Sequence, residues 1–157
     1  MKIALVYGGR SGEHSVSCVS ATSILRAIDP NKYTVILIGI DHDGCWYRQN
    51  TPSTKELENS DFILSVNAPG SGQIAFIPGK GITINSQSIE IDAAFPILHG
   101  TFGEDGTIQG LFEMLNIPYV GSGVVGSSVG MDKHLAKELW QSAGINVVPY
   151  RVLFKHE

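Results

Sequence analysis

The pattern of apolar residues changes twice within the first forty residues, and this change constrains the fold more than any other feature. Residues 3–6 form a short, continuous apolar run, typical of a buried strand, and a glycine-rich turn follows at 8–12. Apolar and small residues then recur at helical spacing over 16–28, before Asp29-Pro30-Asn31 ends the pattern. A β-branched run covers 34–40. This order predicts a βαβ unit with parallel strands and a right-handed crossover, and therefore an α/β fold.

Between residues 41 and 92 the sequence predicts short strands joined by turns instead of further βαβ units. The candidate strands cover 46–48, 74–77, 82–84 and 88–91. Residues 67–72 are rich in Gly, Pro and Ser, which is typical of a loop. We therefore expect this part of the chain to be an excursion from the main sheet.

A strand and a helix are predicted again from residue 93. The strand covers 93–98, and because Pro96 cannot donate a backbone hydrogen bond, we expect it at an edge or a strand end. Apolar residues at positions 108, 111, 112 and 115 then have the spacing of one helix face. Asp105 is the expected N-cap of this helix, and Asn116 is the expected left-handed residue at its C-terminal end.

The last part of the chain is less uniform. Residues 121–130 are small and rich in glycine, so we expect a flexible segment there. Asp132 is expected to cap a helix that Gly144 closes. A final strand is predicted over 147–154, where few residues remain to provide a partner strand. We therefore expect the sequence to stop as a second unit begins.

Composition excludes several classes of function. Of the 157 residues, 43% are hydrophobic and 17% charged, which is typical of a soluble globular protein. The 11 Lys+Arg and 15 Asp+Glu give a net charge of −4 without a basic cluster, so we expect no nucleic-acid partner. Cysteine spacing indicates no disulfide framework or zinc site, and the histidines have no metal-ligand spacing. Broken apolar stretches and a short opening run predict no membrane span, no signal peptide and a cytoplasmic location.

Two loops that follow predicted strands carry the first candidate site residues. Glu13 lies near the start of the first helix, where the helix dipole stabilises an acid, so it is either a first-turn acid or a ligand for an ammonium group. His99 ends a strand and is followed by a glycine-rich loop that carries Glu104 and Asp105. His99 is either a partly buried structural histidine or a binding residue, whereas helix capping is the favoured role of Asp105.

Lys133 is the third candidate. It lies in the first turn of a predicted helix and four residues before Lys137, and both features are unfavourable for a lysine. Either solvent makes these costs small, or Lys133 binds a ligand phosphate. The known nucleotide motifs do not decide the question, because position 7 is Tyr where a dinucleotide fingerprint needs Gly, and no Walker sequence follows the turn at 8–12.

Three segments together resemble the D-alanine–D-alanine ligase family. Residues 8–17 (GGRSGEHSVS) are similar to its N-terminal loop, and residues 99–110 (HGTFGEDGTIQG) match its HGxxGEDGxxQG signature. Residues 117–123 (IPYVGSG) and 131–133 (MDK) continue the match in the expected order. Each segment alone is a modest signal, but their order and spacing together are highly specific.

The resemblance covers essentially the whole chain but only the front of the family, whose members are longer. It implies a three-layer, Rossmann-like (pre-ATP-grasp) α/β domain over residues 1–122, with a parallel sheet and helices on both faces. Residues 123–157 would be a linker and the first helix and strand of a truncated ATP-grasp domain. The family's later motifs, which supply a second lysine for ATP, a phosphate loop and the Mg²⁺ ligands, do not occur in the sequence. We therefore expect the chain to be inactive by itself.

The resemblance also implies a reaction for the parent enzyme. ATP phosphorylates the carboxylate of one D-alanine, and the amine of a second D-alanine attacks the acyl phosphate, which gives D-alanyl-D-alanine for peptidoglycan. By the same resemblance, Glu13 lies near the ammonium of the first D-alanine and His99 near its carboxylate. Glu104 supports the histidine, Lys133 contacts an ATP phosphate, and the protein is a homodimer formed through this domain.

Three alternatives stay open. The chain could be a non-catalytic module of the same fold that binds an amino acid or a nucleotide. It could be a nicotinamide-binding oxidoreductase domain, although the missing glycine at position 7 counts against it. Within the ligase family, it could belong to a variant that accepts D-lactate as second substrate.

Overall fold

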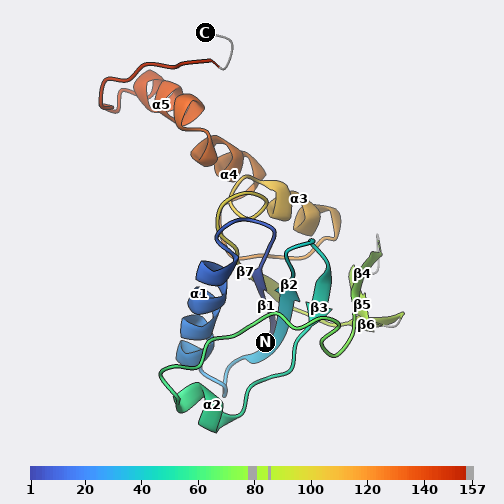
Figure 1. Ribbon diagram of the computed structural model, residues 1–157. Helices are drawn as coiled ribbons and strands as arrows, with labels where there is room; N and C mark the ends of the chain where they lie inside the picture. The colour runs from blue at the N-terminus through green and yellow to red at the C-terminus, as the bar shows by residue number, and fades with distance from the viewer. Residues whose placement is uncertain (78–80, 85, 155–157) are drawn as a thin grey trace.

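The computed structural model describes residues 1–77, 81–84 and 86–154 (Figure 1). Within these residues, the chain forms two β-sheets and five helices. Their bounds are β1 (Lys2–Gly8), α1 (His14–Ala27), β2 (Thr34–Ile40), β3 (Trp46–Arg48), α2 (Thr54–Glu58), β4 (Ile74–Ile77), β5 (Gly81–Ile84), β6 (Gln87–Ile89), β7 (Ala93–Ile97), α3 (Thr107–Met114), α4 (Val124–Met131) and α5 (Lys133–Ser142).

The main sheet has the strand order β3-β2-β1-β7. Its central strand β1 pairs in parallel with β2 and with β7, so that Leu5 lies opposite Leu37 on one side and Phe95 on the other. The predicted βαβ unit is therefore confirmed, and β3 adds an antiparallel edge. The expected edge position of Pro96 is also confirmed, because β7 is the opposite edge strand.

Alternate side chains of β1 face two different layers, because successive residues of a strand point to opposite faces. Leu5 and Tyr7 are fully buried and pack in a cluster with residues of α1. Ala4 and Val6 belong to the opposite cluster, which includes Phe112 of α3. The predicted α/β fold, with a parallel sheet between helical layers, is confirmed.

A second, antiparallel sheet with the order β4-β5-β6 covers part of the same face as α3. Ile74 and Ile82 bury their side chains in the cluster of Ala4 and Val6. The predicted excursion from the main sheet is therefore present, and its strands lie in the same layer as α3. In Figure 1 this sheet lies beside β3.

Two expectations for the C-terminal part are wrong. The segment expected to be flexible, 121–130, contains helix α4. Gly123 is the N-cap of this helix, and its carbonyl accepts a hydrogen bond from the Ser127 N–H at 2.9 Å. Buried Ser127 and the Ser128 hydroxyl, which donates to the Asp105 carbonyl at 2.8 Å, hold this glycine-rich helix in place. The expected strand over 147–154 is absent, because these residues pair with no strand in the described part of the chain.

The helix after Asp132 is confirmed as α5. The Asp132 carboxylate accepts hydrogen bonds from the His134 and Leu135 N–H groups at 2.9 and 3.0 Å, and Gly144 has the left-handed φ of +77° expected beyond a helix end. Figure 1 shows α4 and α5 projecting from the body of the molecule. None of the helices in the described residues has the length and apolar character needed to cross a lipid bilayer.

Candidate functional site

The loops after β1 and β7 lie side by side because these two strands are parallel neighbours that end at the same edge of the sheet. Ser17 of α1 fastens both ends. Its buried hydroxyl accepts a hydrogen bond from the Gly8 N–H at 2.8 Å and donates one to the Ile97 carbonyl. Further along, the Ser11 hydroxyl donates to the His99 carbonyl at 2.7 Å. The two loops therefore have a fixed relative position.

Glu13 lies at the N-cap position of α1, but its side chain makes no capping hydrogen bond. The carboxylate instead lies against the loop that follows β7. A Cβ atom added at Gly100, which has a φ of +69°, would lie only 2.6 Å from Glu13 Oε2. Glycine at this position therefore allows the Glu13 carboxylate to approach the backbone beside His99.

His99 is about one-third exposed and lies between a hydroxyl and a carboxylate. Its Nε2 is 3.1 Å from Ser20 Oγ on α1, and its Nδ1 is 3.9 Å from Glu104 Oε1. Glu104 also accepts a hydrogen bond from the Gly100 N–H at 2.7 Å through its other carboxylate oxygen. These contacts hold the imidazole between the Ser20 hydroxyl and the Glu104 carboxylate, so His99 can take part in a polar binding site.

The structure therefore brings three of the four predicted site residues together and leaves the fourth apart. Glu13, His99 and Glu104 all lie around Gly100. Lys133 is exposed at the start of α5, which Figure 1 shows away from the ends of β1 and β7. Sequence reasoning did not single out Ser20, although it lies about two turns along α1 from Glu13 at the N-cap.

Asp105 holds the loop before α3, one residue from its expected place. The N-cap is Gly106, with a φ of +94°. Asp105 still accepts hydrogen bonds from the Phe102 N–H at 2.9 Å and from the Thr107 N–H at 3.0 Å. Partial burial acts to raise the pKa of Asp105, but these hydrogen bonds outweigh it and hold the pKa below its ordinary value of 3.8.

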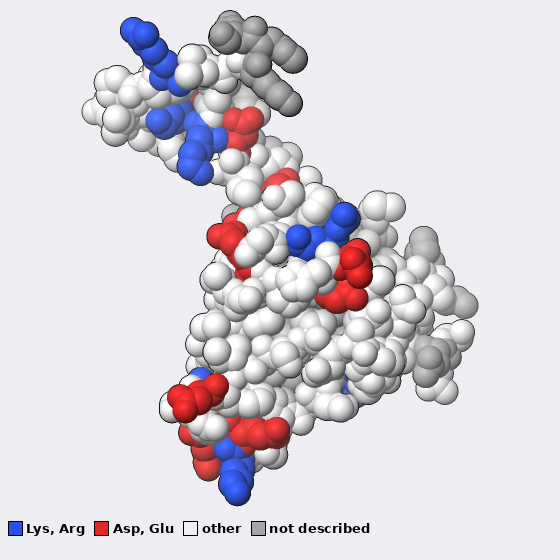
Figure 2. Space-filling view, in the orientation of Figure 1, with Lys and Arg blue, Asp and Glu red and all other residues white. Residues whose placement is uncertain are grey.

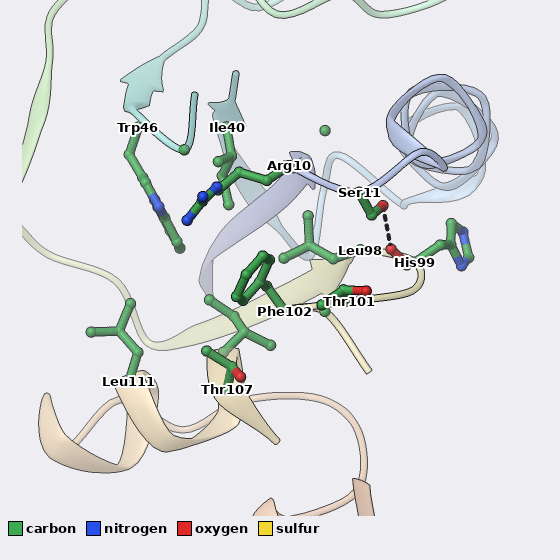
Figure 3. A pocket seen from close by; sticks show the side chains of 15 residues that line it. Arg10, Ser11, Ile40, Trp46, Leu98, His99, Thr101, Phe102, Thr107 and Leu111 are labelled. Carbon is green, nitrogen blue, oxygen red and sulfur yellow. Dashed lines mark hydrogen bonds between the residues drawn. The ribbon is translucent and has the colours of Figure 1, made fainter. Parts of the chain in front are cut away.

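A cavity of about 200 Å³ opens on the other side of the same two loops (Figure 3). Figure 3 shows Arg10, Trp46, Phe102 and Leu111 around this space, whereas the His99 imidazole points away from it. The lining residues are Gly8, Gly9, Arg10, Ser11, Ile40, Gly44, Trp46, Leu98, His99, Thr101, Phe102, Gly103, Thr107, Ile108 and Leu111. Sequence reasoning missed this cavity, whose only available signal was the glycine-rich turn after the first strand.

The resemblance implies ATP and Mg²⁺, and the described residues fit ATP better than Mg²⁺. Lys133 forms no ion pair with another described residue, so its ammonium is available for a phosphate. For Mg²⁺, no three His, Cys, Asp or Glu side chains come close enough to hold an ion in the part of the chain that the structure describes. We therefore assign no step to Mg²⁺ here.

Comparison with known protein families identifies the family of this chain. The family model described as "D-ala D-ala ligase N-terminus" matches residues 2–122. The chain belongs to the D-Ala–D-Ala ligase family. Within this family, the D-alanine–D-alanine ligase of Mycobacterium ulcerans is 42% identical over 166 residues, and that of Corynebacterium aurimucosum is 44% identical over 161. Both alignments cover 98% of this chain.

Solved structures of D-Ala–D-Ala ligase relatives agree with the fold. The ligase from Coxiella burnetii has a TM-score of 0.85 at 35% identity and is matched over 100% of this chain and 46% of its own. The VanG D-Ala:D-Ser ligase from Enterococcus faecalis has a TM-score of 0.77 at 36% identity, with 93% and 43% covered. The chain spans 43% of the length of the M. ulcerans ligase and 44% of that of C. aurimucosum.

Proposed function

We propose that this chain is the part of a D-alanine–D-alanine ligase that binds the first D-alanine. The observation that carries the proposal is the convergence of Glu13, His99 and Glu104 around Gly100, at the carboxyl ends of two parallel strands. Membership of the D-Ala–D-Ala ligase family supports the same role. In the whole enzyme, the product D-alanyl-D-alanine is used in peptidoglycan synthesis in the cytoplasm.

Glu13, His99 and Glu104 have different proposed roles, which follow from their charge. The Glu13 carboxylate binds the ammonium of the first D-alanine, and because the side chain makes no capping bond, it is free to do so. His99 lies near the substrate carboxylate and donates to it. Glu104 positions His99 through the contact at 3.9 Å and fixes the loop through the Gly100 N–H.

ATP supplies the phosphoryl group that makes the carboxylate of the first D-alanine reactive, so that the amine of a second D-alanine can attack it. We propose that Lys133 binds a phosphate of ATP and that the remaining ligands for ATP and Mg²⁺ come from the rest of the ligase. This follows the proposed division into a substrate domain over 1–122 and the start of an ATP-grasp domain over 123–157.

A homodimer formed through the substrate domain is part of the proposal. The apolar side chains Val16 and Val19 of α1 are 52% and 46% exposed, and Ile63 is 51% exposed. Val19 and Ile63 line the same surface hollow. An apolar surface of this kind on a globular protein supports contact with a second copy.

The second substrate is a separate question. The D-Ala:D-Ser ligase of E. faecalis is 36% identical to this chain, and the D-Ala–D-Ala ligase of C. burnetii is 35% identical. Because a D-Ala:D-Ser ligase matches this region about as well as one solved D-Ala–D-Ala ligase, a variant that joins D-alanine to D-serine or D-lactate is the second candidate, although the curated D-alanine–D-alanine ligases are more similar, at 42% and 44% identity. D-alanine as first substrate is common to all of these reactions.

The test joins this chain to the remaining part of the M. ulcerans ligase and measures phosphate release and D-alanyl-D-alanine formation. We expect the chimera to be active and the 157-residue chain alone to release no phosphate. Glu13→Gln in the chimera should lower kcat/KM about 30-fold, the equivalent of about 2 kcal/mol for a charged hydrogen bond.

Glu58→Gln is the matched control, because Glu58 is an exposed acid at the end of α2. Activity that is equal in the Glu13→Gln and Glu58→Gln chimeras would exclude the proposed role of Glu13. The non-catalytic alternative has its own readout in calorimetry of the 157-residue chain. Tight, stoichiometric binding of ATP or D-alanine alone, with an inactive chimera, would favour a binding module.

A further inference from the structure

The cavity in Figure 3 combines a single cation with apolar walls. Arg10 is the one arginine or lysine among its lining residues, and none of them is acidic. The other side chains are mostly aliphatic or aromatic, including Ile40, Trp46 and Leu98. Glu13 and Glu104 do not line the cavity, so it is separate from the carboxylates proposed to bind the first D-alanine.

The Arg10 guanidinium is positively charged but has no anionic partner among the described residues. Among the described residues no carboxylate pairs with its guanidinium, which lies 4.9 Å from the centroid of the Phe102 ring. The stem of Arg10 packs closely over Gly44, where an added Cβ would lie 2.6 Å from Arg10 Cδ. The side chain is therefore held over the cavity by packing, and its charge is available to a ligand.

Phe102 presents an aromatic face at a cost in backbone strain. It is 42% exposed and has a φ of +69°, a left-handed conformation that is unfavourable for a bulky residue. The Asp105 carboxylate accepts from its N–H, and its carbonyl accepts from the Ile108 N–H at 3.2 Å. Strained residues held in this way are concentrated at ligand-binding sites.

Trp46 provides a second aromatic wall. Its ring meets Phe76 of the small sheet edge-on, with the ring centroids 4.8 Å apart, and this contact fixes its orientation. The cavity therefore has two positioned rings and one guanidinium. An apolar group bound between the walls would be removed from water, and an anion attached to it would meet the guanidinium.

We propose that this cavity binds a small monocarboxylate whose apolar part is an aromatic ring or a branched chain. The volume of about 200 Å³ is below the roughly 300–1,000 Å³ of sites for drug-sized ligands, which limits the occupant to about one ring. A planar guanidinium matches a carboxylate in two parallel hydrogen bonds. A phosphate dianion fits less well, because one cation would have to compensate two charges in an apolar site.

The test is titration of the 157-residue chain with phenylacetate, followed by NMR of the backbone amides and the Trp46 indole N–H. We expect saturable binding with shifts at Trp46, Leu98 and Leu111. 2-Phenylethylamine has the same ring but a positive charge, so it should bind at least about tenfold more weakly. Equal binding of the two compounds, or no saturable binding of phenylacetate, would overturn the proposal.

Variants then locate the site. Arg10→Met keeps the apolar stem and removes the charge of an exposed residue, so it should weaken phenylacetate binding at least about tenfold and leave the fold intact. Arg151→Met, at an exposed arginine in the C-terminal part, is the control and should have no effect. Glu13→Gln should also leave the affinity for phenylacetate unchanged, because Glu13 does not line the cavity. An Arg10→Met chain that binds as well as the unchanged chain would refute the site.

Discussion

At the scale of single residues, a few polar side chains fix the shape of the site by bonding to backbone. Asp105 is the clearest case, because its two carboxylate oxygens accept N–H groups on opposite sides of it in the chain. The left-handed Phe102 and the start of α3 both depend on this residue. One carboxylate therefore joins the geometry of the loop to the geometry of the helix.

Asp105→Asn is predicted to destabilise the protein by about 1 kcal/mol at neutral pH, the usual cost of losing a helix-terminal acceptor. An asparagine can place its oxygen toward only one of the two N–H groups, and its NH₂ then faces the other. The measurement is denaturant unfolding of both proteins as a function of pH.

The pH dependence has a definite sign. Because the folded pKa of Asp105 lies below 3.8, its contribution is fully present above pH 3.8 and is lost as the pH falls through the folded value. The difference between the two proteins should therefore shrink in acid. Asp43→Asn is the control, because Asp43 is exposed and its side chain makes no hydrogen bond with a described residue. A difference that persists unchanged in acid would contradict the prediction.

Sequence reasoning located some site residues and missed others for a physical reason. Glu13 and His99 follow predicted parallel strands, and the topology of such a sheet places their loops at one edge. Arg10 lies in the same loop as Glu13, but its significance depends on the absence of a partner and on Phe102, ninety-two residues further along the chain. Local pattern carries no information about contacts of that range.

At the scale of secondary-structure elements, α3 connects the core to the site. Phe112 is fully buried in the larger apolar cluster, whereas Met114 of the same helix is 79% exposed. The two side chains are of similar size and two residues apart. They therefore separate the effect of burial from that of helix propensity.

Phe112→Ala is predicted to lower the free energy of unfolding by about 3–5 kcal/mol, because it removes a large buried ring and leaves a cavity. Met114→Ala should change it by less than about 0.5 kcal/mol, as is usual for an exposed position. Thermal or denaturant unfolding of the two variants checks the difference. Similar effects of the two substitutions would show that α3 does not pack on the core as described.

The elements that sequence reasoning predicted well are those with a strong local signal. β2 has the bounds that the sequence predicts, because most of its residues are β-branched. Helix α2 was not predicted, although Ser53 and Glu56 form a capping box that the sequence contains. The sequence predicts a flexible segment where α4 forms, because local pattern does not show the Ser128 hydrogen bond that stabilises this glycine-rich helix.

At the scale of the whole molecule, charge is distributed unevenly. Figure 2 shows Lys and Arg gathered on the projecting C-terminal part, and the basic residues described there are Lys133, Lys137 and Arg151. The Glu13 and Glu104 side chains, whose carboxylates we propose belong to the D-alanine site, lie in the body of the molecule. This separation agrees with a division of labour between a body that binds an ammonium and a C-terminal part that meets a phosphate.

Lys133→Met in the chimera is predicted to raise KM for ATP about tenfold and to leave KM for D-alanine unchanged, because only the phosphate loses a charged partner. Lys137→Met is the control, since the Lys137 ammonium lies 4.5 Å from the centroid of the Tyr150 ring of the same chain. Steady-state kinetics with each substrate varied in turn make the comparison. An equal rise in both KM values would argue against a phosphate role for Lys133.

The body of the molecule could be predicted from the sequence, whereas the course of its last residues could not. The order of β1, α1 and β2 follows from local periodicity, and parallel pairing follows from that order. The expected strand over 147–154 depended on neighbours that local pattern does not specify. A strand requires a partner, so an apolar run predicts one only where a partner is known.

The attachment of α4 to the turn at Asp105 and Gly106 sets the direction in which α4 and α5 leave the body of the molecule. The Ser128 hydroxyl meets the turn itself, and Gly106 leaves no room for a side chain, since an added Cβ would lie within contact of Ser128 Oγ. From Ser128 to the end of α5 the chain extends at most about 21 Å at 1.5 Å per residue. A tilt of about 10° at Ser128 would therefore displace the end of α5 by up to about 4 Å, less than one helical turn, and would displace Lys133, at the start of α5, by less. The loop before α3 thus also sets the direction in which the helix that carries Lys133 leaves the body of the molecule.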